Sequence, residues 1–152
     1  MTEALRKFRR LSGMERGIVC ESAALIPAAW VAVRVFGFRV GAALQSQGVR
    51  SAPEPKKEYL KLAECIARLA SAAAARLPFQ TSCLEQSIAL CWMLQRRGMN
   101  PQLRVGGRKD AEGFEAHAWV EVEGAALDCG GAEHLHFVPF GTRDVSLETR
   151  TD

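Results

Sequence analysis

The hydrophobic pattern of this chain changes period at Asn100-Pro101. Before this point apolar residues recur at helical spacing, and strong helix formers dominate the segment 58–77. After it apolar and polar residues alternate, and the segment 114–122 has one apolar face and one face that carries His117. A change from helical to strand periodicity predicts helices that pack on a small antiparallel sheet, which is an α+β fold.

The clearest helix begins after Ser82. Ser82 and Glu85 have the spacing of a capping box, in which each side chain satisfies a free backbone amide of the other residue. Arg96-Arg97-Gly98 then supplies residues that favour a helix C-terminus. The pattern predicts that Cys83 lies in the first turn of this helix.

A second capping box, formed by Ser12 and Glu15, predicts a helix in the N-terminal part of the chain. Pro27 and Gly37 are expected to bend or divide this helix, because proline lacks an amide donor and glycine favours helix ends. The helix belongs to a separate N-terminal unit.

The segment 45–55 contains Gly48 and two prolines, a composition that is typical of a linker. We place a boundary near Ser51. The sequence therefore predicts an N-terminal helical extension, residues 1–50, and a second domain, residues 51–152.

Cysteine content and charge exclude several classes of protein. Five cysteines, an odd number without a C-x-x-C pair, predict neither a disulfide framework nor a zinc ribbon and fit a reducing cytoplasm. The apolar stretch 18–44 is interrupted by charged residues and a proline, so it lacks the roughly 20 uninterrupted apolar residues of a membrane span. Basic residues are dispersed without interleaved aromatic residues, which argues against nucleic-acid binding. We expect a cytoplasmic protein that binds no nucleic acid.

Cys83 is the candidate nucleophile, because cysteine attacks as a thiolate and the first turn of a helix stabilises an anion. The same amides can stabilise the oxyanion of a tetrahedral intermediate, with Gln80 or Thr81 as side-chain donors just upstream. His117, on a following strand, is the candidate base. An imidazole there can accept the thiol proton and later protonate an amine leaving group.

A carboxylate is needed to orient that imidazole. A two-residue turn at Glu123-Gly124 sets Asp128 diagonal to His117 on the same face of a hairpin. A register that differs by one residue would move Asp128 to the opposite face and leave Glu133 or Asp144 as the candidates.

A lone cysteine in a helix is more often a small buried hydrophobic residue than a nucleophile. The combination of a cysteine at a capped helix start, a histidine on a following strand and an aspartate on its hairpin partner favours catalysis. We interpret the other four cysteines as structural. A zinc site formed by Cys129, His134 and His136 matches no common ligand spacing, so we predict neither a metal nor another cofactor.

Three stretches of the chain carry a resemblance to a known family. They are Cys83-Leu84-Glu85-Gln86-Ser87-Ile88-Ala89-Leu90, Arg96-Arg97-Gly98 and Phe114-Glu115-Ala116-His117-Ala118-Trp119-Val120-Glu121. Their order resembles that in lasso-peptide leader peptidases, which belong to the transglutaminase-like and papain-like cysteine hydrolases. The resemblance implies a catalytic triad of Cys83, His117 and Asp128, with the cysteine-bearing helix packed on the sheet.

By this resemblance the chain is expected to remove the leader from a lasso precursor peptide, after which an ATP-dependent macrolactam synthetase closes the ring. The first 50 residues lack the alternating strands of a leader-binding domain, so a separate leader-recognition protein is the implied partner. The N-terminal helices offer apolar and basic surfaces for these partners or for weak membrane association.

Two alternatives stay open at this point. One is a transglutaminase-like acyltransferase with the same triad, in which an amine replaces water as acceptor. The other is a non-catalytic scaffold that binds a peptide within a biosynthetic complex.

Overall fold

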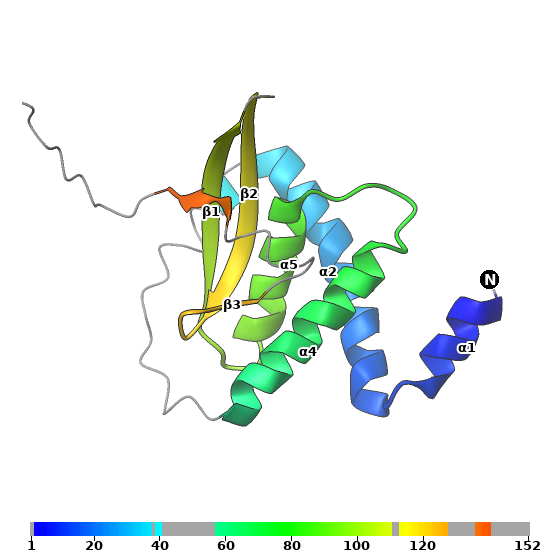
Figure 1. Cartoon of the computed structure of the whole chain (residues 1–152). Helices are drawn as coiled ribbons and strands as arrows, with labels where there is room; N and C mark the ends of the chain where they lie inside the picture. The colour runs from blue at the N-terminus through cyan, green and yellow to red at the C-terminus, as the bar shows by residue number, and fades with distance from the viewer. Residues whose placement is uncertain (1, 38, 41–56, 111–112, 128–135, 141–152) are drawn as a thin grey trace, which may run out of the picture.

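The fold consists of helices packed against a small sheet (Figure 1). The computed structural model describes residues 2–37, 39–40, 57–110, 113–127 and 136–140. The helices are α1 (Thr2–Arg10), α2 (Gly13–Phe36), α4 (Lys57–Ala74) and α5 (Cys83–Gln95). The strands β1 (Pro101–Asp110), β2 (Gly113–Val122), β3 (Ala125–Leu127) and β4 (Val138–Pro139) form one antiparallel sheet in the order β3-β2-β1-β4. The predicted α+β fold is confirmed.

One hydrophobic core joins α2, α4 and α5 to the sheet. Its fully buried members include Ile18 and Ile26 of α2, Ile66 of α4, Leu90 of α5 and Val120 of β2. Burial of an aliphatic side chain of this size stabilises a fold by about 1.5–3 kcal/mol. α2 therefore shares its core with the helix that carries the candidate nucleophile.

Polar contacts fix the rotation of α2 against α5. The buried hydroxyl of Ser22 donates to the carbonyl of Ile18 at 2.7 Å and lies 3.6 Å from Sδ of Met93. The carboxylate of Glu21 is 2.6 Å from Nη2 of Arg97 in the turn that follows α5. These contacts determine which face of α2 is turned toward the core.

The N-terminus of α2 is capped as the sequence predicts. The N–H of Ser12 donates to the Glu15 carboxylate at 2.8 Å, and the N–H of Glu15 donates to the Ser12 hydroxyl at 3.2 Å. Hydrogen bonds from Ser12 lower the pKa of Glu15, because they stabilise the charged carboxylate. The predicted helix start is therefore confirmed.

α2 runs unbroken through Pro27 and ends before Gly37, whose φ of 60° closes the helix. The expected division thus falls at Gly37 and not at Pro27. Proline removes the hydrogen bond to the carbonyl of Ala23, and Ala23 is exposed, so water can bind that carbonyl. The expected domain boundary near Ser51 lies outside the described residues.

By length and composition alone, α2 is long and apolar enough to cross a membrane. Of its most apolar 18-residue stretch, 22% is buried inside the protein. Core helices of soluble proteins meet the same criterion, so the composition of α2 by itself decides nothing about a membrane.

The hairpin between β2 and β3 has the predicted two-residue turn. Glu123 and Gly124 have φ values of 51° and 77°, and a type I′ turn requires positive φ at both central residues. Val122 pairs with Ala125 across the turn, which is the register that the sequence predicts. The ladder is described as far as Leu127.

The two faces of β2 differ as the alternation predicts. Ala118, Val120 and Val122 are buried, and the two valines belong to the core that includes α5. His117 and Trp119 lie on the other face. Trp119 is nevertheless buried, because its ring covers the backbone of β1.

Gly106 of β1 makes room for this arrangement. A Cβ atom added at Gly106 would lie 2.7 Å from the carbonyl oxygen of Val138 in β4 and 3.0 Å from the ring of Trp119. The nearest atoms to a Cβ at Gly107 would be those of two rings, that of Phe140 at 2.6 Å and that of Phe114 at 2.7 Å. Those two side chains are 58% and 67% exposed, so they can turn aside.

Gly106→Ala is expected to lower the free energy of unfolding by about 1–3 kcal/mol, because the backbone of β4 and a buried indole must shift. Gly107→Ala is the matched control and is expected to cost less than about 1 kcal/mol. Urea denaturation followed by circular dichroism measures both. Equal losses in the two variants would contradict the packing constraint at Gly106.

Candidate active site

Cys83 is the first residue of α5, and the predicted capping box holds it there. The N–H of Ser82 donates to the Glu85 carboxylate at 2.7 Å, and the N–H of Glu85 donates to the Ser82 hydroxyl at 3.4 Å. Glu85 is buried and Cys83 is half-buried. The thiol is therefore held at the helix end where the macrodipole is positive.

Two backbone N–H groups beside the thiol are available to an anion. The N–H of Glu85 bonds the Ser82 hydroxyl, and the N–H of Gln86 bonds the Ser82 carbonyl at 3.2 Å. Within the part of the chain that the structure describes, the N–H groups of Cys83 and Leu84 make no hydrogen bond. Such amides favour a negatively charged atom, either a thiolate or an oxyanion.

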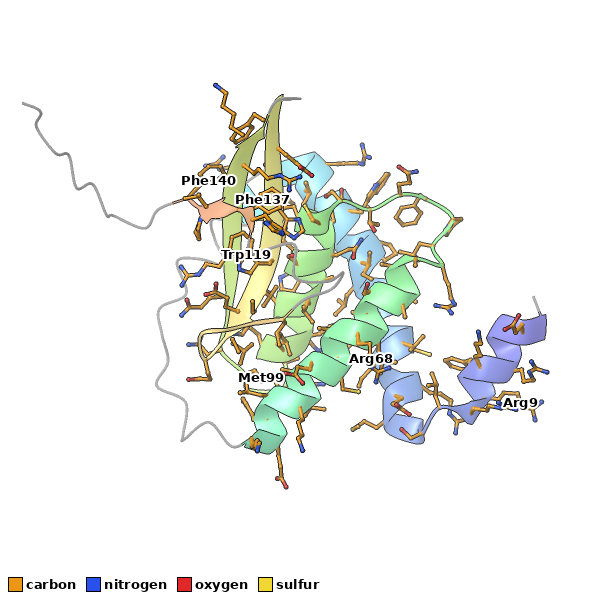
Figure 2. All side chains as sticks on the ribbon, viewed as in Figure 1. Arg9, Arg68, Met99, Trp119, Phe137 and Phe140 are labelled. Atoms are coloured by element: carbon orange, nitrogen blue, oxygen red, sulfur yellow. The ribbon has the colours of Figure 1, made fainter. Side chains whose placement is uncertain are left out.

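His117 lies on β2 between two aromatic rings. Its ring centroid is 6.2 Å from that of Trp119 and 5.0 Å from that of Phe137. The guanidinium of Arg108 lies 5.1 Å from the centroid of the Phe137 ring. Figure 2 shows the labelled side chains of Trp119 and Phe137 beside the long strands. These two ring contacts therefore limit the positions that the imidazole can take.

A buried hydrogen bond ties the start of α5 to the strand of His117. The hydroxyl of Ser87 donates to the carbonyl of Ala118 at 3.1 Å. Ser87 lies four residues after Cys83, about 6 Å along the helix axis, and Ala118 directly follows His117. The structure brings the first turns of α5 and this strand together, whereas no hydrogen bond joins Sγ of Cys83 to the His117 ring among the residues it describes.

Several residues weighed from the sequence lie outside the described ranges. They include all three candidates for the orienting carboxylate, Asp128, Glu133 and Asp144, and two of the zinc ligands considered, Cys129 and His134. Within the described ranges, no group of three His, Cys, Asp or Glu side chains is placed to hold a metal ion. The assignment of Asp128 stays a prediction.

The other described cysteines have different surroundings. Cys91 is buried inside α5, where it fills the core as expected of a structural residue. Cys65 is half-buried on α4 and packs against that core. Cys20 is exposed on α2, so it does not have the packing role that the sequence suggested.

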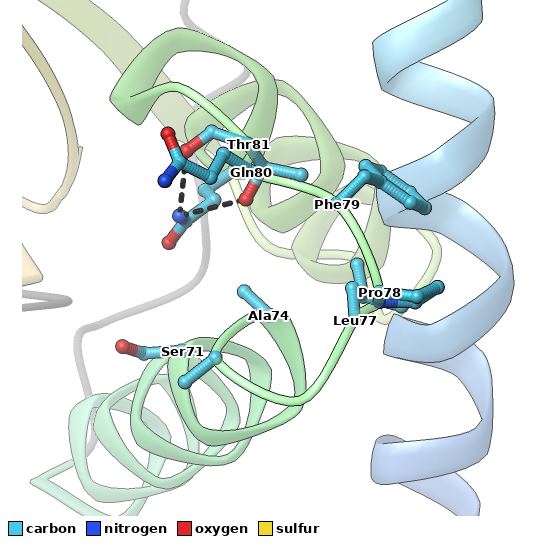
Figure 3. A pocket seen from close by; sticks show the side chains of 9 residues that line it. Ser71, Ala74, Leu77, Pro78, Phe79, Gln80 and Thr81 are labelled. Carbon is cyan, nitrogen blue, oxygen red and sulfur yellow. Dashed lines mark hydrogen bonds between the residues drawn. The ribbon is translucent and has the colours of Figure 1, made fainter.

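A cavity of about 570 Å³ lies beside the start of α5 (Figure 3). Its walls come from the end of α4, the loop 75–82 and α5, and none of the lining residues is ionisable: Ser71, Ala74, Ala75, Leu77, Pro78, Phe79, Gln80, Thr81 and Gln86. Figure 3 shows Gln80 and Thr81 on one side of this space and Ser71 and Ala74 across from them.

The sequence did not reveal this cavity. It suggested Gln80 and Thr81 only as oxyanion donors, because they precede Cys83 directly. No local pattern indicates that Ser71, at the far end of α4, comes to lie across from them. The cavity results from the angle between two helices, which is a property of their packing.

The loop before Cys83 is held by α2. The ring of Phe79 packs on Trp30 of α2 at a centroid distance of 5.4 Å, and the guanidinium of Arg34 lies 4.0 Å from the centroid of the Trp30 ring. Aromatic pairs of this kind contribute about 0.5–1.5 kcal/mol beyond their burial. The sequence assigned α2 to an N-terminal extension, but this helix positions the residues that lead into the candidate nucleophile Cys83.

One known family matches this chain. The model of the transglutaminase-like superfamily covers residues 23–142, well over half of the sequence, and includes both Cys83 and His117. No curated protein and no solved structure matches the chain significantly.

Trp30→Ala is expected to speed hydrogen exchange of the amides in 77–82 about two- to twelvefold, the factor that corresponds to about 0.5–1.5 kcal/mol. Trp30→Phe, which keeps a ring against Phe79, and Val31→Ala, at an exposed neighbouring position, are the controls. Exchange followed by mass spectrometry reports each peptide separately. Unchanged exchange in Trp30→Ala would show that other contacts hold this loop.

Proposed function

Because this chain belongs to the transglutaminase-like superfamily, we propose that it is a cysteine peptidase that removes the leader from a lasso-peptide precursor. The observation that supports the proposal is the start of α5. There a half-buried thiol lies beside two amides that have no hydrogen bond to any described residue, and a buried hydrogen bond fixes this part of α5 next to the strand of His117.

In the first step, His117 takes the proton of Cys83, and the thiolate attacks the carbonyl carbon of the scissile peptide bond. A C–S bond forms and the carbonyl oxygen becomes an oxyanion. The N–H groups of Cys83 and Leu84, which bond no described residue, are the donors that this oxyanion would meet. Their contribution does not depend on the side chain of Gln80.

In the second step, the tetrahedral intermediate collapses and the C–N bond breaks. The imidazolium of His117 gives its proton to the departing amine, which leaves as the N-terminus of the core peptide. The leader stays on Cys83 as a thioester. Water, deprotonated by the same imidazole, then attacks the thioester, the C–S bond breaks, and the leader leaves with a free carboxylate.

The imidazole must reach the thiol for these steps. A catalytic hydrogen bond is often long or poorly aligned in a free enzyme and shortens when substrate binds. Asp128 is proposed as the residue that orients His117, because it would be diagonal to His117 if the β2–β3 register continued one residue beyond Leu127. A carboxylate there also stabilises the imidazolium that forms.

The substrate and the partners follow from the resemblance of the motifs around Cys83 and His117. The proposed substrate is the leader region of a lasso precursor, presented by a separate leader-recognition protein. The proposed recipient of the core is an ATP-dependent macrolactam synthetase. The chain would supply proteolysis alone, in the cytoplasm, without a cofactor.

An acyltransferase is the second candidate, and membership of the superfamily favours it over a scaffold. It would use the same thioester on Cys83, and a primary amine would replace water in the last step. The two activities differ in their products. A peptidase yields a leader carboxylate, whereas an acyltransferase yields a leader amide.

Cys83→Ala and His117→Ala are each expected to reduce precursor cleavage by roughly a thousandfold or more, because each removes one half of the nucleophile–base pair. Cys20→Ala is the matched control, since that thiol is exposed and distant in the sequence. The assay mixes the protein with the precursor, with and without the recognition protein and an added primary amine, and identifies the products by mass spectrometry.

Cleavage by a folded Cys83→Ala protein would overturn the nucleophile assignment. A leader amide as main product would identify an acyltransferase. Peptide binding by the wild-type chain without any product would leave the scaffold as the function of this fold.

Asp128→Asn is expected to lower kcat by about tenfold or more with little change in KM, because the imidazole loses its charged partner but substrate contacts remain. Glu133→Gln and Asp144→Asn test the alternative carboxylates in the same assay. A large loss of kcat in one of these variants, with full activity in Asp128→Asn, would reassign the third member of the triad.

A further inference from the structure

The cavity beside α5 is positioned to bind a side chain of the substrate. Gln86 lies three residues after Cys83, and residues at this spacing are neighbours on a helix surface. Thr81 and Gln80, which precede Cys83 in the sequence, lie on the same side of the cavity as Gln86, which hydrogen-bonds Thr81. A peptide held with its carbonyl carbon at Cys83 therefore has this cavity within reach of an adjacent side chain.

We propose that this cavity is a specificity pocket that selects an uncharged side chain carrying a hydrogen-bond donor, next to the bond that is cleaved. The proposal rests on the proposed peptide substrate. It adds which residues of this chain contact a side chain of that substrate and which chemical class of side chain they bind.

The first argument is charge. None of the nine lining residues is ionisable. A carboxylate or ammonium group that entered the cavity would find no opposite charge among these residues, so any water it gave up would not be replaced by an ion pair. Substrates with Asp, Glu, Lys or Arg at this position are therefore disfavoured.

The second argument is the orientation of the Gln86 amide. Its Nε2 donates to the carbonyl oxygen of Thr81 at 3.4 Å and to Oγ1 of Thr81 at 3.0 Å. A carbonyl oxygen only accepts, so the nitrogen of the amide and not its oxygen must face Thr81. This pair fixes the amide in one orientation.

The consequence is an oriented acceptor. With both contacts to Thr81 made by Nε2, the Oε1 atom of Gln86 makes no hydrogen bond within the described residues. Gln86 is half-buried, so a ligand that covers Oε1 must replace the water there with a donor of its own. A carboxamide or hydroxyl side chain supplies that donor, whereas an aliphatic side chain of the same size does not.

The third argument is size and lining. A volume of about 570 Å³ lies within the range of about 300–1,000 Å³ that is usual for ligand pockets. This volume is larger than that of a single side chain, so the cavity can hold a substrate side chain together with the peptide backbone that carries it. Ala74, Leu77 and Phe79 supply apolar wall for the stem of that side chain.

The test uses acetylated octapeptides of alanine in which one position at a time carries Asn, Leu or Asp. These three side chains have similar shapes and differ in the donor and in charge. Binding to the Cys83→Ala protein is followed by NMR through the backbone amides of 80–86, and cleavage by the wild-type protein is followed by mass spectrometry. We expect one position at which Asn binds at least about tenfold more tightly than Leu or Asp.

Gln86→Met is expected to abolish the preference for Asn over Leu, because it removes the acceptor. Gln95→Met, on the last turn of the same helix and outside the cavity, is the matched control and should keep the preference. Gln86→Glu retains an acceptor oxygen but loses the donation to Thr81, so it should also keep the preference for Asn over Leu and reject Asp more strongly.

The outcomes separate the two proposals. No preference at any position, or a preference that survives in Gln86→Met, overturns the pocket whether or not the protein cleaves peptides. Loss of the preference in both Gln86→Met and Gln86→Glu also overturns the pocket. The preference would then depend on the hydrogen bond from Gln86 that orders the loop at Thr81, and not on the acceptor oxygen at position 86. The expected binding pattern without cleavage supports the pocket and counts against the peptidase.

Discussion

Hydrogen bonding in the first two turns of α5 is the constraint on which the rest of the site depends. The Ser82–Glu85 box fixes the residue at which the helix begins, and a good cap is worth about 1 kcal/mol. Ser87 then fixes how these turns lie against Ala118 of β2. If the chain shifted by one residue along the position of this helix, each side chain would turn by about 100° around the axis, which would move Ser87 off that carbonyl and Cys83 from its place at the helix start. The local cap and the tertiary contact therefore specify the same register.

The N-terminal helix α2 supports that site by packing against α5 and against the loop that precedes Cys83. Its inner face belongs to the core shared with α5, and Trp30 holds the loop that leads to Cys83 through Phe79. Its outer face is apolar as well, with Val31 and Val35 exposed. A helix that is apolar on both faces meets the compositional criterion for a membrane span even though one side is core. Composition alone therefore hides the structural role of α2, which only its contacts show.

The parts of the fold that the sequence predicts correctly are those set by neighbouring residues. Both capping boxes and the Glu123-Gly124 turn form as predicted, because each depends on residues at most three positions apart. The unbroken course of α2 through Pro27 and the tilted packing of Phe137 against His117 were not predicted. Tertiary packing decides both, since it compensates for a lost helical bond in one case and joins distant segments in the other.

In the candidate site, too, the sequence predicts the features that depend on neighbouring residues and misses those that depend on tertiary packing. The sequence indicates Cys83 and His117 through their positions on a capped helix and on an alternating strand, but it gives no sign of the cavity. In the two proposals, one helix start serves both reaction and selection, because the cavity lies beside the turn that carries Cys83. On the side that faces α4, the start of α5 borders the cavity wall formed by Gln86 and Thr81. On the side that faces the sheet, it borders the strand of His117. If a substrate side chain fills the α4 side, the leaving amine and the next nucleophile would use the sheet side, where the strand of His117 lies. Whether that nucleophile is water or an amine then depends on what approaches this side after the first product leaves, and not on the thiol.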